Sequence, residues 1–178
     1  AENVYDFSLG NPLLEPPEVL TKALAEITAE AAPGSHRYMP NNGYPGVRQA
    51  VARSMGKQEG VELTADDIVM TVGAAGALNV TMRSLLEPGD EVLVLAPYFV
   101  EYLFYVRFHG GVPVVVDTTD TFDLDIGAIE AAITPKTKAI IVNTPNNPTG
   151  VIYSPERMQE LAACLDRAEK KHGRAIYM

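Results

Sequence analysis

The chain has 178 residues, of which 47% are hydrophobic and 21% are charged, and its formal net charge is −9. These proportions are typical of a globular domain with a sizeable core, and the negative charge argues against nucleic acid or an anionic membrane as a partner. Cys164 is the only cysteine, so no internal disulfide can form, which favours a reducing compartment. Without an apolar run of membrane-spanning length or a signal-peptide pattern, we expect a cytoplasmic protein that spans no membrane.

Hydrophobic spacing predicts helices and then a regular alternation of strands and helices. Helices are expected at residues 15–31, 47–59, 73–86, 99–109, 125–133 and 154–172. Strands are expected at 68–72, 91–95, 112–116 and 138–142, with the first residues of another at 175–178. These strands are apolar without alternation, which predicts an α/β fold with a largely parallel sheet and helices on both faces.

Two of these helices carry a clear start signal. Ser154 precedes Pro155, which is the order expected for an N-cap followed by the first helical residue. The helix at 125–133 is expected to be capped by Asp123 or Asp125.

Two segments that follow predicted strands have residues suited to a ligand, because ligands of parallel sheets bind beyond the carboxyl ends of the strands. Gly73-Ala-Ala-Gly76 lets backbone N–H groups converge on an anion at a helix start, and tight strand–helix packing explains it about as well. Pro97-Tyr-Phe99 places an aromatic side chain where it can lie on a planar ring, although most aromatic residues serve core packing.

A third such segment, Asn143-Thr-Pro-Asn-Asn-Pro-Thr-Gly150, follows the strand at 138–142. Its prolines, asparagines and glycine force a tight loop, which puts Asn146 and Asn147 where a ligand would be bound. An amide can donate a fixed hydrogen bond to a ligand oxygen, while a plain turn explains the loop about equally well.

Taken together and in this order, these segments resemble the class I/II aminotransferases, which are PLP-dependent enzymes of fold type I, similar to aspartate aminotransferase. The resemblance extends from Leu9-Gly-Asn-Pro12 to about Met178. It implies that the backbone N–H groups of Ala74 and Ala75 hold the phosphate of pyridoxal 5'-phosphate (PLP). It also implies that Phe99 stacks on the cofactor ring.

The same resemblance gives Asn147 a hydrogen bond to the phenolic oxygen of PLP and predicts a cis peptide bond between Asn147 and Pro148. Tyr38, which by itself is better explained by half-buried packing, would reach the phosphate in the neighbouring subunit of a homodimer. Gly10 would approach the carboxylate of the substrate, since it has no side chain. The implied substrates are an amino acid and a 2-oxo acid, in amino acid biosynthesis.

The resemblance further divides the chain into an N-terminal segment at 1–45 and the first part of a PLP-binding large domain at 46–178. The lysine that forms the Schiff base with PLP is expected beyond Met178, because none of the lysines present lies in a suitable motif. The three histidines lack metal-ligand spacing and are interpreted as surface or structural residues, so no metal site is expected.

Two alternatives remain open for the function. A C–S lyase or another β-lyase uses the same cofactor and fold, and a non-catalytic domain that has lost the lysine would keep the fold alone. Simple Rossmann-type nucleotide binding is disfavoured because the chain has no G-x-G-x-x-G motif.

Overall fold

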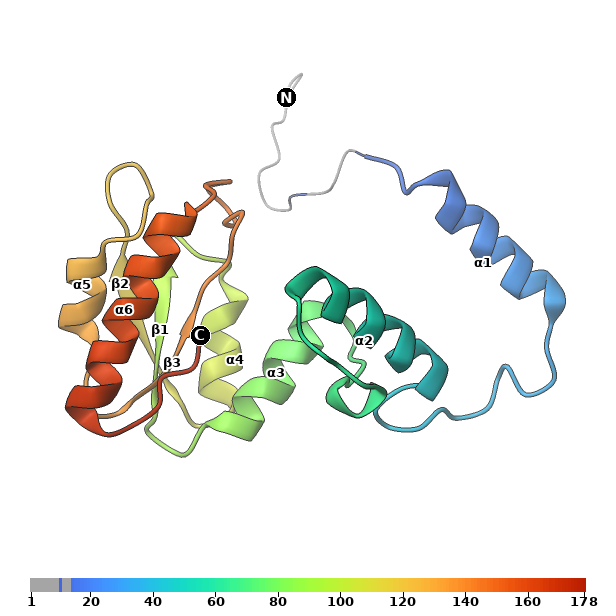
Figure 1. The fold of residues 1–178 in the computed structure, drawn as a ribbon, viewed down its shortest axis with the longest axis horizontal. Coiled ribbons are helices and arrows are strands. Elements are labelled where there is room, and N and C mark those ends of the chain that lie inside the picture. Colours follow the sequence, from blue (N-terminus) through green and yellow to red (C-terminus); the bar gives the residue numbers. More distant parts are fainter. Residues whose placement is uncertain (1–9, 11–13) are drawn as a thin grey trace, which may run out of the picture.

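The computed structural model describes residue 10 and residues 14–178. The helices α1 (Glu18–Glu30) and α2 (Pro45–Glu59) come first, followed by the short 3-10 helix η1 (Ala65–Asp67). The remaining elements, in chain order, are α3 (Gly73–Leu85), β1 (Glu91–Ala96), α4 (Glu101–Phe108), β2 (Val112–Asp117), α5 (Ile126–Ala132), β3 (Thr137–Ile141) and α6 (Pro155–His172). The predicted α/β alternation is therefore confirmed (Figure 1).

The three strands form a parallel sheet in the order β2-β1-β3. In β1, Glu91 to Ala96 lie opposite Val112 to Asp117 of β2, and β3 pairs with the other edge of β1. A parallel neighbour requires a crossover connection, and α4, α5 and α6 supply helices that cover the sheet. The expected parallel sheet with helices on both faces is confirmed.

The central strand β1 contributes to two cores because successive side chains point to opposite faces. Leu93 and Leu95 belong to the core that includes Leu161 of α6 and Ile129 of α5. Val92 belongs to a second core with Met82 of α3, Leu86 at the C-cap of α3, and Tyr105 and Val106 of α4. Burial on both faces explains why the strand has no polar alternation.

The helix α1 lies apart from the sheet and buries none of its residues (Figure 1). Its apolar side chains keep helical spacing, yet Val19, Leu24 and Ile27 are exposed. It begins three residues later than expected, at Glu18 after Pro16-Pro17. The apolar stripe therefore predicted the helix correctly. Within the described part of the chain, however, no other element covers this stripe.

The strand expected at 68–72 is not formed, which corrects the sequence-based prediction. This segment is irregular, and Val69 and Val72 are exposed. Its backbone bonds to a loop instead, since the Met70 N–H donates to the Asn42 carbonyl at 3.1 Å. A strand needs a neighbour for its backbone groups, and no strand of the described chain lies beside this segment.

The strand expected at 175–178 is present only as one parallel bridge between Ala139 and Tyr177. Two backbone hydrogen bonds hold it, from Ile140 N–H to the Tyr177 carbonyl at 2.8 Å and from Tyr177 N–H to the Lys138 carbonyl at 3.0 Å. The pairing thus extends the sheet beyond β3, as the sequence indicated, but over too few residues to count as a strand.

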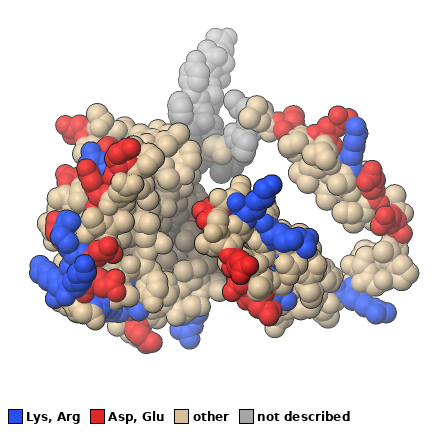
Figure 2. All heavy atoms as spheres, viewed as in Figure 1, with Lys and Arg blue, Asp and Glu red and all other residues tan. Residues whose placement is uncertain are grey.

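Charged side chains of both signs are interspersed over the face drawn in Figure 2, including the part formed by α5 and α6. The net charge of −9 is therefore not gathered into one acidic patch on this face. None of the helices in the described ranges has the length and apolar character needed to cross a bilayer.

The N-caps of α5 and α6 follow the sequence signals. Asp125 is the cap of α5, and its carboxylate accepts from the Ala128 N–H at 2.9 Å. Ser154 caps α6, and its hydroxyl accepts from the Arg157 N–H at 3.1 Å. Both caps satisfy a backbone donor that would otherwise have no partner in the first helical turn.

Replacing Ser154 with alanine is expected to lower the free energy of unfolding by about 1 kcal/mol, because the Arg157 N–H loses its acceptor. Ser154→Asp keeps an acceptor at the same position and should retain most of the stability. Urea unfolding of the three proteins, followed by far-ultraviolet circular dichroism, measures the difference. Equal losses for both variants would contradict the capping role.

Candidate functional site

The candidate site lies at the carboxyl edge of the sheet, where β1 and β3 end in proline-containing loops. The peptide bonds Ala96–Pro97, Thr144–Pro145 and Asn147–Pro148 are cis. The prediction of a cis bond before Pro148 is therefore confirmed. The helix α3 ends shortly before β1 begins and slants back from the amino end of the sheet, so that its start lies beside α2 (Figure 1).

The two adjacent asparagines of the loop after β3 differ in burial. Asn146 is buried with 9% exposure, whereas Asn147 is exposed. The Asn146 backbone donates to the Val151 carbonyl at 2.9 Å and accepts from the Gly150 N–H at 2.7 Å. Its side-chain oxygen accepts from the Thr149 N–H at 3.3 Å and from the Thr149 hydroxyl at 3.1 Å.

These bonds make Asn146 the internal anchor of the loop, which corrects the expectation that both amides face a ligand. The neighbouring Tyr153 is buried under the same loop. Burial and the negative charge of Asp123 raise the pKa of Tyr153, and the Asn146 amide acts in the opposite direction. Of the two asparagines, only Asn147 is exposed.

The start of α3 offers two backbone donors. Gly73 has a φ of +65°, a left-handed conformation that glycine adopts without strain. The Gly73 N–H donates to the Thr71 carbonyl at 3.1 Å and the Gly76 N–H to the Val72 carbonyl at 3.2 Å. Within the described residues, the N–H groups of Ala74 and Ala75 have no hydrogen-bond acceptor, and both residues are exposed.

This helix start has the features of an anion site. Val72, at the N-cap position, has no side chain that accepts a hydrogen bond. The helix runs for 13 residues, so its dipole and its free N–H groups both favour a negative group at this end. Gly76 keeps the turn close to Thr71, since a Cβ at Gly76 would lie 3.3 Å from the Thr71 Cβ.

The aromatic residue of the site, Phe99, lies in the short loop between β1 and α4. It is half-buried and packs edge-to-face on Tyr102, with ring centroids 5.8 Å apart and an interplanar angle of 79°. Burial raises the pKa of Tyr102. The helix α4 begins at Glu101, two residues later than expected, so Phe99 belongs to the loop at the strand end.

Tyr38 and Gly10 are not brought to this edge. Tyr38 lies in the loop between α1 and α2 and is fully exposed, and that loop is far from the sheet in Figure 1. A Cβ placed at Gly10 would have no neighbour within 4 Å. Their roles toward a second subunit and a substrate stay predictions.

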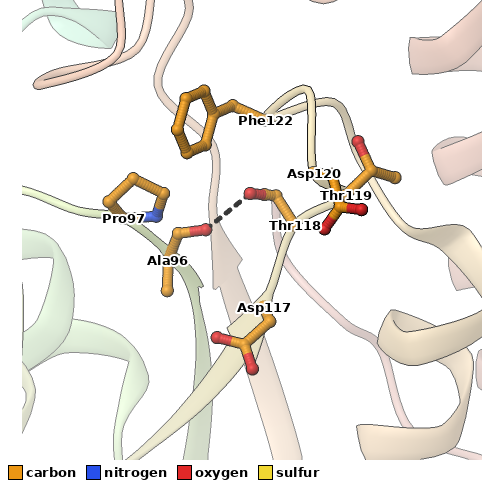
Figure 3. A pocket seen from close by; sticks show the side chains of 7 residues that line it. All are labelled: Ala96, Pro97, Asp117, Thr118, Thr119, Asp120 and Phe122. Carbon is orange, nitrogen blue, oxygen red and sulfur yellow. Dashed lines mark hydrogen bonds between the residues drawn. The ribbon is translucent and has the colours of Figure 1, made fainter.

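The sequence did not indicate a wide depression of about 620 Å³ beside Pro97, at the ends of β1 and β2. Its lining also includes Asp117 at the end of β2 and, from the loop that follows, Thr118, Thr119, Asp120 and Phe122 (Figure 3). The Thr118 hydroxyl donates to the Ala96 carbonyl at 2.7 Å, which ties this loop to β1. The polar run after a predicted strand was the available signal for a loop at this edge.

The structure is a parallel α/β fold with helices on both faces of the sheet, a class in which ligands bind at the carboxyl ends of the strands. The family described as aminotransferase class I and II matches residues 2–172 of the chain. The chain belongs to this family.

Relatives and solved structures agree with this assignment. The chain is 44% identical over 155 residues to a probable aspartate/prephenate aminotransferase of Thermus aquaticus, covering 86% of this chain and 40% of that relative. An amino transferase from Eubacterium rectale has a TM-score of 0.91 at 36% identity, over 98% of this chain and 45% of that one. A tetra mutant of the aspartate aminotransferase of Thermus thermophilus has a TM-score of 0.81 at 38% identity, over 94% of this chain and 45% of that one. The chain thus spans less than half the length of these proteins.

Proposed function

We propose that this chain is the part of a PLP-dependent aminotransferase that holds the cofactor. The observation that carries the proposal is the pair of N–H groups at Ala74 and Ala75, which have no acceptor within the described residues and stand at the start of a 13-residue helix. A phosphate group fits such donors. The exposed residue Asn147 and the half-buried Phe99 belong to loops that follow the carboxyl ends of β3 and β1.

Each of these residues has a defined task toward PLP. Ala74 and Ala75 would donate their N–H groups to the phosphate, and their small side chains leave the approach open. Asn147 would donate to the phenolic oxygen and favour its ionised form. Phe99 would lie against the ring, where stacking contributes about 0.5–1.5 kcal/mol beyond burial. When bound, PLP supplies an electron sink for the negative charge that develops at the α-carbon of an amino acid.

The proposed reaction moves an amino group from an amino acid to a 2-oxo acid. The relatives are named aspartate, aspartate/prephenate and N-acetyl-LL-diaminopimelate aminotransferases, so aspartate is the first amino donor to assay. Amino acid biosynthesis in the cytoplasm is the proposed setting. We also propose a homodimer in which Tyr38 reaches the neighbouring site and Gly10 approaches the substrate, with the N-terminal segment at 1–45 separate from the large domain.

The test is the absorbance spectrum of the full-length gene product with added PLP, before and after borohydride. We expect a visible band that borohydride removes, and a lysine that carries the mass of the reduced cofactor in a tryptic digest. Incubation with aspartate and a 2-oxo acid should yield the corresponding new amino acid. No band, together with complete loss of PLP on dialysis, would overturn the proposal.

A further inference from the structure

The first turn of α3 is held through its carbonyl oxygens. The Thr71 hydroxyl donates to the Gly73 carbonyl at 3.1 Å, and the Asn79 side-chain amide donates to the Ala75 carbonyl at 2.9 Å. An ordinary N-cap side chain would instead accept from the second or third N–H of the helix. Val72 makes no such bond, so the turn is fixed while its N–H donors remain available.

The amide of Asn79 is itself held by a second helix. Its oxygen lies 3.2 Å from Nε2 of His109, the residue at the C-cap of α4. A carbonyl oxygen can only accept a hydrogen bond, so the Asn79 nitrogen must face Ala75 and its oxygen must face His109. His109 must then donate from Nε2, which fixes its tautomer. Both side chains are partly buried between α3 and α4.

We propose that Asn79 and His109 are positioning residues for the phosphate site, with His109 orienting Asn79 and Asn79 fixing the Ala75–Gly76 peptide, which directly follows the Ala75 N–H and closes the first turn through the bond from the Gly76 N–H to the Val72 carbonyl. This inference rests on the proposed function, because it concerns the phosphate of the same cofactor. The pair also connects the helix that would bind the phosphate to the helix that follows Phe99. A change at His109 therefore reaches the Ala75–Gly76 peptide, which adjoins the Ala75 donor, through one side chain.

The test compares PLP with pyridoxal, which has the same ring without the phosphate, by absorbance titration of the full-length gene product. Asn79→Ala removes the bond to the Ala75 carbonyl, so that the first turn of α3 is less well fixed, and should weaken PLP binding by up to about tenfold, the full effect of one lost neutral hydrogen bond. The affinity for pyridoxal should not change. If Asn79 only stabilised the fold, Asn79→Ala would weaken the binding of PLP and of pyridoxal alike.

His109 is tested by two substitutions. His109→Phe removes the donor to Asn79 and should weaken PLP binding by about twofold to threefold, less than Asn79→Ala because the Asn79 amide still reaches Ala75 part of the time. His109→Gln keeps a side-chain N–H and should restore most of the affinity. Pyridoxal binding again serves as the reference.

Ser84→Ala is the matched control on the same helix. The Ser84 hydroxyl donates to the Val80 carbonyl at 2.8 Å, so it makes the same kind of bond four residues back. It lies beyond the first turn, and its loss should leave both affinities unchanged. The free energy of unfolding of each cofactor-free variant identifies any general loss of structure.

Two results would overturn the inference while the proposed function stands: wild-type affinity for PLP in Asn79→Ala, or an equal loss of affinity for PLP and pyridoxal. A wild-type protein that binds neither compound would overturn the proposed function itself, and this inference with it. The wild-type titration therefore separates the two failures.

Discussion

Asn147→Ala is expected to weaken PLP binding of the full-length gene product by about tenfold to a hundredfold, the effect of losing a hydrogen bond to a charged oxygen. The side chain is exposed and makes no hydrogen bond with other described residues. Its removal should therefore leave the free energy of unfolding within about 0.5 kcal/mol of the wild type. Absorbance titration with PLP and urea unfolding of the cofactor-free protein measure the two quantities.

The adjacent residue gives the matched comparison. Asn146 is buried and holds the Thr149 N–H and hydroxyl, so Asn146→Ala leaves buried groups without partners. We expect a loss of about 1–3 kcal/mol in the free energy of unfolding. If Asn147→Ala destabilises the protein as much as Asn146→Ala, or leaves the PLP affinity unchanged, Asn147 does not have the proposed role.

The second large effect concerns an ion pair at the amino edge of the sheet. Arg174 Nη2 lies 2.6 Å from Asp90 Oδ1, and the Glu87 N–H donates to Asp90 Oδ2 at 3.0 Å. Asp90 is buried and precedes β1, so Arg174→Met leaves a carboxylate without its main partner inside the protein. The free energy of unfolding should fall by about 3 kcal/mol in urea titrations.

An exposed pair serves as the control. Arg167 donates from Nε and Nη2 to the two oxygens of Glu130 at 3.3 and 3.2 Å, but both side chains are more than half exposed. Arg167→Met should cost less than about 1 kcal/mol, because water already solvates both groups. Similar losses for Arg174→Met and Arg167→Met would show that burial does not strengthen the Asp90 pair.

The Asp90 pair also predicts a pH dependence. Burial raises the pKa of the Asp90 carboxyl, but the hydrogen bonds from Arg174 and Glu87 and the charges of Arg174 and Lys138 outweigh it, so the pKa is lowered. Because the pKa of Asp90 is lower in the folded state, the ionised carboxylate stabilises the protein at pH values above the unfolded-state pKa of about 3.9. This stabilisation is lost as the pH falls through the folded-state pKa. The stability difference between wild type and Asp90→Asn should therefore shrink below about pH 4. A difference that stays constant there would contradict the pairing.

Local signals in the sequence were sufficient for most of the elements and for the loops at the ends of β1 and β3. The caps at Asp125 and Ser154 formed as expected because each uses a side chain and a backbone N–H only three residues apart. The loop containing Asn147 also lies at a strand end as predicted, since turn residues act on their own neighbourhood. Membership of the family followed from the order of such segments.

The strand expected at 68–72 shows where local signals are insufficient. Its apolar, β-branched residues favour a strand, but strand formation depends on a partner that is distant in the sequence. The different burial of Asn146 and Asn147 also depends on the tertiary structure, because two identical neighbouring residues differ only in what surrounds them.

The sequence by itself determined the helices, the parallel strands, the tight loops and the family, because spacing and turn chemistry act over a few residues. Only the tertiary structure decided which asparagine is exposed, which strand pairs, and that His109, 30 residues from Asn79 in the chain, holds the amide beside Ala75. These features depend on contacts between elements that packing brings together, and the free energy of such contacts is not encoded in any single segment.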